Sequence, residues 1–121
     1  MSRLGRIMGR LAMAALFIES GLKVAQDPGH RPKLAADLGI PQPELATRAN
    51  GAAMVAGGSL LATGLADRAA ATLLAGLLIP TTLAGHRFWE KEDDAEKAAQ
   101  RIHFLKNLSI FGAMIYIASS D

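Results

Sequence analysis

Two uncharged apolar runs, separated by one charged turn, constrain this chain most. They read "ANGAAMVAGGSLLATGLA" at 49–66 and "AAATLLAGLLIPTTLAGH" at 69–86, and only Asp67 and Arg68 stand between them. Each run is close to the roughly 20 apolar residues that a helix needs to cross the hydrocarbon core of a membrane. Because the connection is so short, the two helices must run antiparallel to each other.

Two further apolar segments, at about 4–25 and 102–119, are interrupted by charges. Glu19 and Lys23 lie in the first, and Lys106 lies near the head of the second. Soluble amphipathic helices show the same pattern, whereas in a membrane such groups face the bundle interior or the interface. The matching lengths favour the membrane interpretation. We therefore predict an all-α fold, an integral membrane four-helix transmembrane bundle, as a single domain over 1–121 with helices at about 4–25, 45–66, 69–89 and 94–119.

The connecting segments differ in character. Residues 26–44 hold four of the five prolines, and "KLAADLGI" between those prolines is expected to form a short helix in the membrane interface. Residues 90–101 are densely charged. Within them Asp93 followed by Glu96 resembles a capping box, so the last helix should begin there, in water, and continue into the bilayer.

Composition supports helices that pack closely in lipid. Half of the chain is hydrophobic, but the apolar residues are mostly Ala, Leu, Gly and Ile, with only one Trp and one Tyr. A soluble core of this size would use more large side chains to fill its volume. The net charge of +2 comes from mixed charges without a basic stripe, so no nucleic-acid partner is expected. Cysteine is absent, which excludes disulfides and thiol redox chemistry by this chain.

The amino-terminal segment is expected to be a retained helix. Arginines at 3, 6 and 10 precede an apolar stretch, as in a signal peptide, but Glu19 and Lys23 interrupt it and no clean cleavage site follows.

In the third segment, Pro80 should bend the helix and release the carbonyl of Gly76, which Thr81 or Thr82 can then satisfy.

Polar residues inside the apolar segments are the candidate site. Glu19 and Lys23 have the i,i+4 spacing of a helical ion pair, with Arg48 as another partner for Glu19. One interpretation is that the two residues pair while Lys23 reaches the interface. The other is an internal polar site that handles protons or a ligand head group. Asn50 lies at the head of the second segment, about one turn before Ala53.

A second polar group lies where the third and fourth segments meet one membrane surface. His103, Lys106 and Asn107 share a face by their spacing, and His86 precedes Phe88 and Trp89. These residues form either an interfacial belt anchored by Phe88 and Trp89 or a polar pocket between helices. The two histidines carry no metal or haem spacing, so neither a metal site nor a haem is expected.

Several stretches, in order along the chain, resemble the DoxX family of small bacterial membrane proteins. They are "RLAMAALFIESGLKV" at 10–24, "LGIPQPELA" at 38–46, "NGAAMVAGGSLLATGLADRAAA" at 50–71, "HRFWE" at 86–90 and "HFLKNLSIFGAM" at 103–114. The resemblance implies a four-helix transmembrane bundle, multi-pass in the bacterial cytoplasmic membrane. It carries over the recurring polar positions Lys23, His86, Lys106 and Asn107, but no catalytic residue.

What the resemblance implies about function is broader. Some relatives are linked to quinone-coupled thiosulfate oxidation, and others to membrane complexes that handle thiol or oxidative stress. The leading hypothesis is therefore an accessory subunit of a larger, redox-linked membrane complex, with no activity of its own. The alternatives are a quinone- or lipid-binding protein and, behind it, a quinone-linked oxidoreductase. The expected partners are membrane lipids and either partner subunits or further copies of the chain.

Overall fold

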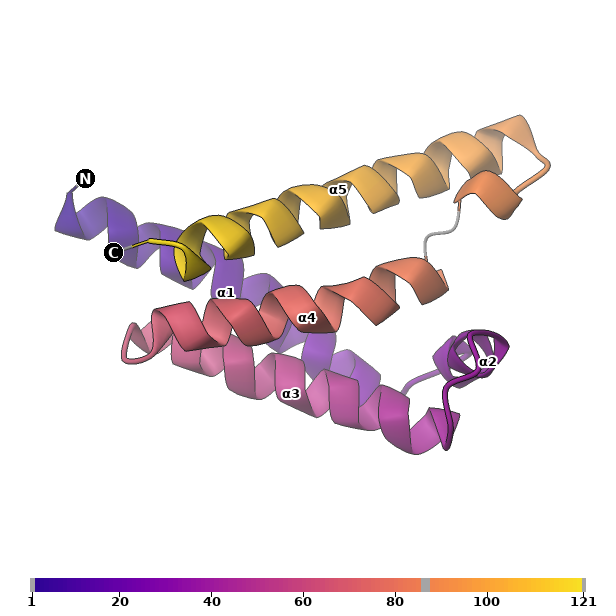
Figure 1. Cartoon of the computed structure of the whole chain (residues 1–121), viewed down its shortest axis with the longest axis horizontal. Helices are drawn as coiled ribbons and strands as arrows, with labels where there is room; N and C mark the ends of the chain where they lie inside the picture. Colours follow the sequence, from indigo (N-terminus) through magenta and orange to yellow (C-terminus); the bar gives the residue numbers. More distant parts are fainter. Residues whose placement is uncertain (1, 86–87, 121) are drawn as a thin grey trace.

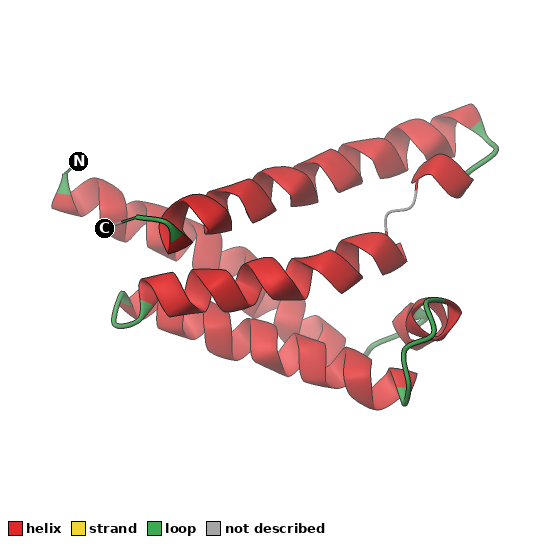
Figure 2. Cartoon of the chain, in the orientation of Figure 1, coloured by secondary structure: helices red, strands yellow, loops and turns green. Residues whose placement is uncertain are grey.

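The computed structural model describes residues 2–85 and 88–120, and in these ranges every regular element is a helix (Figure 2). The prediction of an all-α fold is confirmed. The elements are α1 (Arg3–Gln26), α2 (Arg31–Asp37), α3 (Pro43–Thr63), α4 (Asp67–Gly85), the 3₁₀-helix η1 (Phe88–Glu90) and α5 (Asp94–Ala118).

The helix ends follow from local chemistry. The side chain of Ser2 accepts a hydrogen bond from the Gly5 amide at the start of α1. Asp93 accepts one from the Glu96 amide at 3.0 Å, so α5 begins at the predicted cap. Pro43 opens α3, where its missing N–H costs nothing. Gly64 closes α3 in the left-handed conformation, with φ of 74°, which glycine adopts without steric cost.

The four long helices run alternately up and down (Figure 1). α1 packs on α3, α3 on α4, and α4 on α5. Among the described residues the backbones of α1 and α5 do not approach each other. Both chain ends and the α3–α4 turn lie at one end of the molecule, while α2 and η1 lie at the other. The short helix α2 folds back against α3 and α4.

One hydrophobic core joins all four long helices. Its most deeply buried large side chains are Phe17 on α1, Leu61 on α3, Leu74 on α4 and Met114 on α5. Around this core many large apolar side chains face outward from the same four helices. The interior is therefore narrow, and the outer surface of the bundle is itself apolar.

By length and composition, one stretch, Asp67–Glu90, which contains α4, is apolar enough to cross a membrane. Only 33% of its apolar window is buried, whereas the core helix of a soluble protein is mostly buried. The charges at Glu19 and Lys23 interrupt α1, and those of 94–106 interrupt α5. The structure thus shows an all-helical chain with one such segment, and the four-span topology stays a prediction.

A candidate ligand cavity at the α2 end

A cavity of about 610 Å³ lies among the helices at the α2 end of the molecule. Its volume falls in the range of roughly 300–1,000 Å³ typical of small-molecule sites. All four long helices and the α2 region line it. Most of its wall is apolar and is formed by Leu16, Phe17, Val24, Leu34, Ala35, Ile40, Ala46, Met54 and Leu78.

Asparagines from two helices bring amide groups to this cavity. Asn107 on α5 is only 7% exposed, and its Nδ2 donates a hydrogen bond to Thr82 Oγ1 at 3.0 Å. No partner for the Asn107 side-chain oxygen occurs in the described ranges, yet this atom is not sealed from solvent. An amide oxygen with accessible lone pairs at a cavity wall is available to a ligand.

Asn50 on α3 meets α4 across the same cavity. Its Oδ1 lies 3.4 Å from Thr81 Oγ1, which in turn lies 3.0 Å from the Leu77 carbonyl oxygen. A threonine hydroxyl has one proton, so it donates to one of these two oxygens at a time. The shorter contact, within α4, is the stronger candidate for that proton. The Asn50 amide then keeps most of its hydrogen-bonding capacity for a ligand.

Pro80 and the adjacent Thr81 line the cavity from α4. The ring of Pro80 removes the N–H that would bond the Gly76 carbonyl. We expected Thr81 or Thr82 to satisfy that carbonyl, but Thr81 bonds the carbonyl of Leu77 and Thr82 accepts from Asn107. Thr81 thus makes the usual bond of a helical threonine to the carbonyl four residues earlier, and neither threonine has a hydrogen bond to the Gly76 carbonyl in the described structure.

Cationic residues lie at the cavity, and acidic residues do not. Lys106 on α5 and the neighbouring His30 and Arg31 line it, whereas no Asp or Glu does. Arg31 Nη1 contacts the Pro28 carbonyl oxygen at 3.4 Å, which leaves its other donors available. Lys106 makes no hydrogen bond or ion pair within residues 2–85 and 88–120. The cavity therefore carries an excess of positive charge.

Of the eight residues predicted for a polar pocket, Asn50, Lys106 and Asn107 line this cavity. Glu19 and Lys23 form an ion pair at 3.4 Å, as their spacing predicts, but their side chains are 74% and 72% exposed. His103 is exposed on α5 and does not line the cavity. His86 lies outside the described residues.

Arg48, the remaining predicted residue, ties α3 to the end of α1. Its Nη1 donates to the Ala25 carbonyl at 2.6 Å and contacts the Gln26 carbonyl at 3.3 Å. It pairs with Glu44 at 3.4 Å, rather than with Glu19. A cation is favoured at these carbonyls, because the last carbonyls of a helix lack intrahelical partners and carry partial negative charge.

The predicted anchors Phe88 and Trp89 belong to an aromatic cluster with Phe104. The three rings meet edge to face, with centroids 5.3 to 5.7 Å apart, which is a favourable geometry for aromatic pairs. These contacts hold η1 against α5. Trp89 is 49% exposed and lies at the end of the bundle where the charged 90–101 segment begins.

The α2 wall of the cavity was not predicted as part of the site. The sequence predicts a short interfacial helix, and α2 does form at Arg31–Asp37. It lies over the cavity, to which Leu34 and Ala35 contribute. The available signal was the apolar spacing of Leu34, Ala35 and Ile40, which gives this segment one face to bury.

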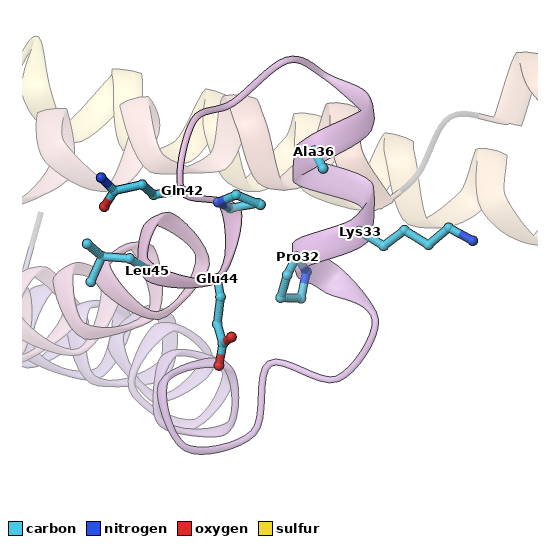
Figure 3. A pocket seen from close by; sticks show the side chains of 7 residues that line it. Pro32, Lys33, Ala36, Gln42, Glu44 and Leu45 are labelled. Carbon is cyan, nitrogen blue, oxygen red and sulfur yellow. The ribbon is translucent and has the colours of Figure 1, made fainter.

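A second depression, of about 430 Å³, is an open groove between α2 and the start of α3 (Figure 3). Its side chains diverge: Lys33 points away from the groove, and Gln42 and Leu45 point away from Pro32. These side chains do not converge on a common point, so the groove has no set of groups arranged to bind a ligand. No group of three or more His, Cys, Asp or Glu in the described part of the chain is placed to hold a metal ion.

Comparison with known families identifies the chain. The sequence profile of the DoxX family matches residues 5–87, which is more than half of the 121 residues. The chain belongs to the DoxX family. The match spans α1 to α4 and includes Asn50 and Thr81, while Lys106 and Asn107 lie beyond it. No curated protein and no solved structure matches the chain.

Membership of the DoxX family confirms the resemblance drawn from the sequence. It supports a small, membrane-associated protein, consistent with the apolar outer surface of the bundle. The region that the family profile covers builds four of the five walls of the cavity. The fifth wall is α5, which supplies both its lysine and its most buried asparagine.

Proposed function

We propose that this DoxX protein spans the bacterial cytoplasmic membrane with α1, α3, α4 and α5 and binds an amphiphile of the quinone or lipid class. The observation that carries the proposal is the cavity of about 610 Å³, with an apolar wall and the amides of Asn50 and Asn107. Sites for amphiphiles need apolar volume for a tail and a few polar groups that orient a head.

The outward side chains support four spans. Leu11, Leu60, Ile79 and Leu108, one from each long helix, are 51%, 43%, 51% and 53% exposed. Large apolar surfaces on every side of a monomer are unfavourable in water and favourable in lipid. The long helices have 24, 21, 19 and 25 residues. At about 1.5 Å per residue each is long enough to cross most or all of a hydrocarbon core of about 30 Å.

A pair of matched variants tests the ligand. Asn107→Leu replaces the buried cavity amide, and Ser109→Leu makes a similar change on the exposed side of the same helix. Each protein is purified in mild detergent, and the co-purifying quinones and lipids are extracted and quantified by mass spectrometry. We expect about a tenfold loss of one retained species in Asn107→Leu, the effect of removing a hydrogen bond worth about 1–1.5 kcal/mol. Ser109→Leu should retain it.

Absence of any specifically retained species from the wild type, or equal retention by both variants, would contradict the proposal. Circular dichroism shows whether Asn107→Leu keeps its helices. Should it unfold, Asn50→Leu probes the same cavity from α3.

A second function, as an accessory subunit of a redox-linked membrane complex, is favoured by the outward glycines. A Cβ built on Gly9, Gly76 or Gly112 meets nothing within 4 Å in the described structure. Such positions let another helix approach closely in lipid. Gentle extraction and mass spectrometry should show partner subunits that Gly76→Leu or Gly112→Leu releases. A wild-type monomer without partners would rule this function out.

A further inference from the structure

We propose that the cavity selects an anionic amphiphile, whose carboxylate or phosphate head lies at Lys106 and Arg31 and whose apolar tail lies along the wall. This inference rests on the proposed ligand cavity and names the chemical class of its occupant. It follows from how charge is distributed around the cavity.

The charges that line the cavity are all of one sign. α1, α3 and α4 present no ionisable side chain to it, the α2 region presents His30 and Arg31, and α5 presents Lys106. The nearest acidic residues on α1 and α3 are engaged elsewhere. Glu19 pairs with Lys23, and Glu44 pairs with Arg48.

Lys106 and Arg31 therefore lack a carboxylate partner in the described part of the chain. Both side chains are exposed at the α2 end of the bundle, where an anion from outside the chain can reach them and the positive charge attracts it. A neutral quinone head can accept hydrogen bonds from Lys106, but it leaves both charges without a counterion. An anionic head supplies hydrogen-bond acceptors and the counterion together.

The remaining polar groups fit the same head. Asn107 is more than nine-tenths buried at the wall and has a free amide N–H beyond the one used by Thr82. Asn50 stands across the cavity with its own amide donors. Amide N–H groups bind anionic oxygens, and the apolar wall through Phe17, Met54 and Leu78 then accommodates the tail.

The test compares probes with equal tails and different heads. Binding of palmitate, palmitoyl lysophosphatidate, neutral monopalmitoylglycerol and a neutral alkyl quinone is measured by equilibrium dialysis with the full chain in nonionic detergent. Inorganic phosphate and acetate serve as heads without tails. The variants are Lys106→Gln and Arg31→Gln, with Lys97→Gln on α5 and Lys33→Gln on α2 as matched controls outside the cavity.

We expect an anionic probe to bind at least about tenfold more tightly than the neutral probes, and each cavity variant to remove about three- to tenfold of that affinity. The controls should bind as the wild type does. The tighter of palmitate and lysophosphatidate identifies the head as carboxylate or phosphate. Circular dichroism confirms the helix content of each variant, and the charge-conserving Lys106→Arg should retain the preference.

Neutral and anionic probes could bind equally well, with affinities that Lys106→Gln and Arg31→Gln do not change. This result would overturn the preference for an anionic ligand but would still support a ligand cavity. Phosphate or acetate that binds as tightly as the tailed probes would also overturn it, because the tail would then contribute nothing. Failure of every tailed probe to bind would remove both this inference and the proposed function.

Discussion

Gly21 on α1 and Gly51 on α3 lie against each other's backbone. A Cβ built on Gly21 would come within 2.5 Å of the Gly51 carbonyl oxygen, and one on Gly51 within 2.7 Å of the Gly21 carbonyl oxygen. No side chain fits between these helices at that point. The approach sets the distance between α1 and α3, and with it the position of the cavity wall that Ser20 and Val24 line.

Substituting either glycine should therefore weaken the α1–α3 contact. We expect Gly21→Ala and Gly51→Ala each to destabilise the protein by about 1–3 kcal/mol, since overpacking forces the backbones apart. Gly9→Ala is the matched control on α1, because its Cβ would meet nothing within 4 Å. It should be neutral or stabilising by up to about 1 kcal/mol through helix propensity. Thermal unfolding in detergent, followed by circular dichroism, measures all three.

The hydrogen bond between Asn107 and Thr82 should couple α5 to α4. Asn107→Leu, Thr82→Val and the double variant form a cycle that isolates the 3.0 Å contact. We expect a coupling free energy of about 1 kcal/mol, the usual net value of a neutral hydrogen bond. Unfolding by denaturant gives the three differences. Strictly additive single effects would mean that the two side chains stabilise the protein independently.

The helical fold could be predicted from the sequence because the features that determine helices are local. Apolar runs, prolines and the cap at Asp93 all act within a few residues. The end of α3 differs from the prediction: the predicted helix extends to residue 66, whereas α3 ends at Thr63. Gly64 adopts a left-handed φ and ends the helix. Because the residues around Gly64 are apolar, the sequence pattern continues past this turn.

The residues that line the cavity could be predicted only in part from the sequence, for two physical reasons. Asn50, Lys106 and Asn107 could be predicted because polar side chains within apolar helices are energetically costly and therefore mark candidate sites. The role of α2 depends on its folding back against α4, a contact between distant parts of the chain that no local pattern reveals. Helix phase mattered too, since Glu19 lies roughly 200° around α1 from the buried Phe17 and so faces outward.

Arg48 should contribute more stability than its ion pair with Glu44 suggests. Arg48→Met retains the apolar stem but leaves the Ala25 carbonyl without its 2.6 Å donor at the end of α1. We expect a loss of about 1–2 kcal/mol, in the range for charged hydrogen bonds after allowance for partial exposure. Lys23→Met is the comparison, because it breaks an exposed pair worth less than about 0.5 kcal/mol. Equal losses would show that the contact with Ala25 adds nothing.

The aromatic cluster offers a direct optical readout, because Trp89 is the only tryptophan of the chain. Phe104 contacts both Phe88 and Trp89, with ring centroids at 5.4 and 5.7 Å. Phe104→Ala should release η1 from α5, increase the exposure of the half-exposed indole, and shift the fluorescence emission of Trp89 to longer wavelength. It should also cost stability, since edge-to-face aromatic pairs contribute about 0.5–1.5 kcal/mol beyond their area.

Leu105→Ala is the control for this change. It removes a neighbouring apolar side chain that is 47% exposed and makes no ring contact. Its emission should match that of the wild type. A Phe104→Ala spectrum identical to the wild type would mean that Phe88 alone holds the indole, and Phe88→Ala would then give the shift instead. Reconstitution into vesicles adds a second expectation: a water-soluble quencher should reach Trp89 more readily in Phe104→Ala, because the ring no longer lies against α5.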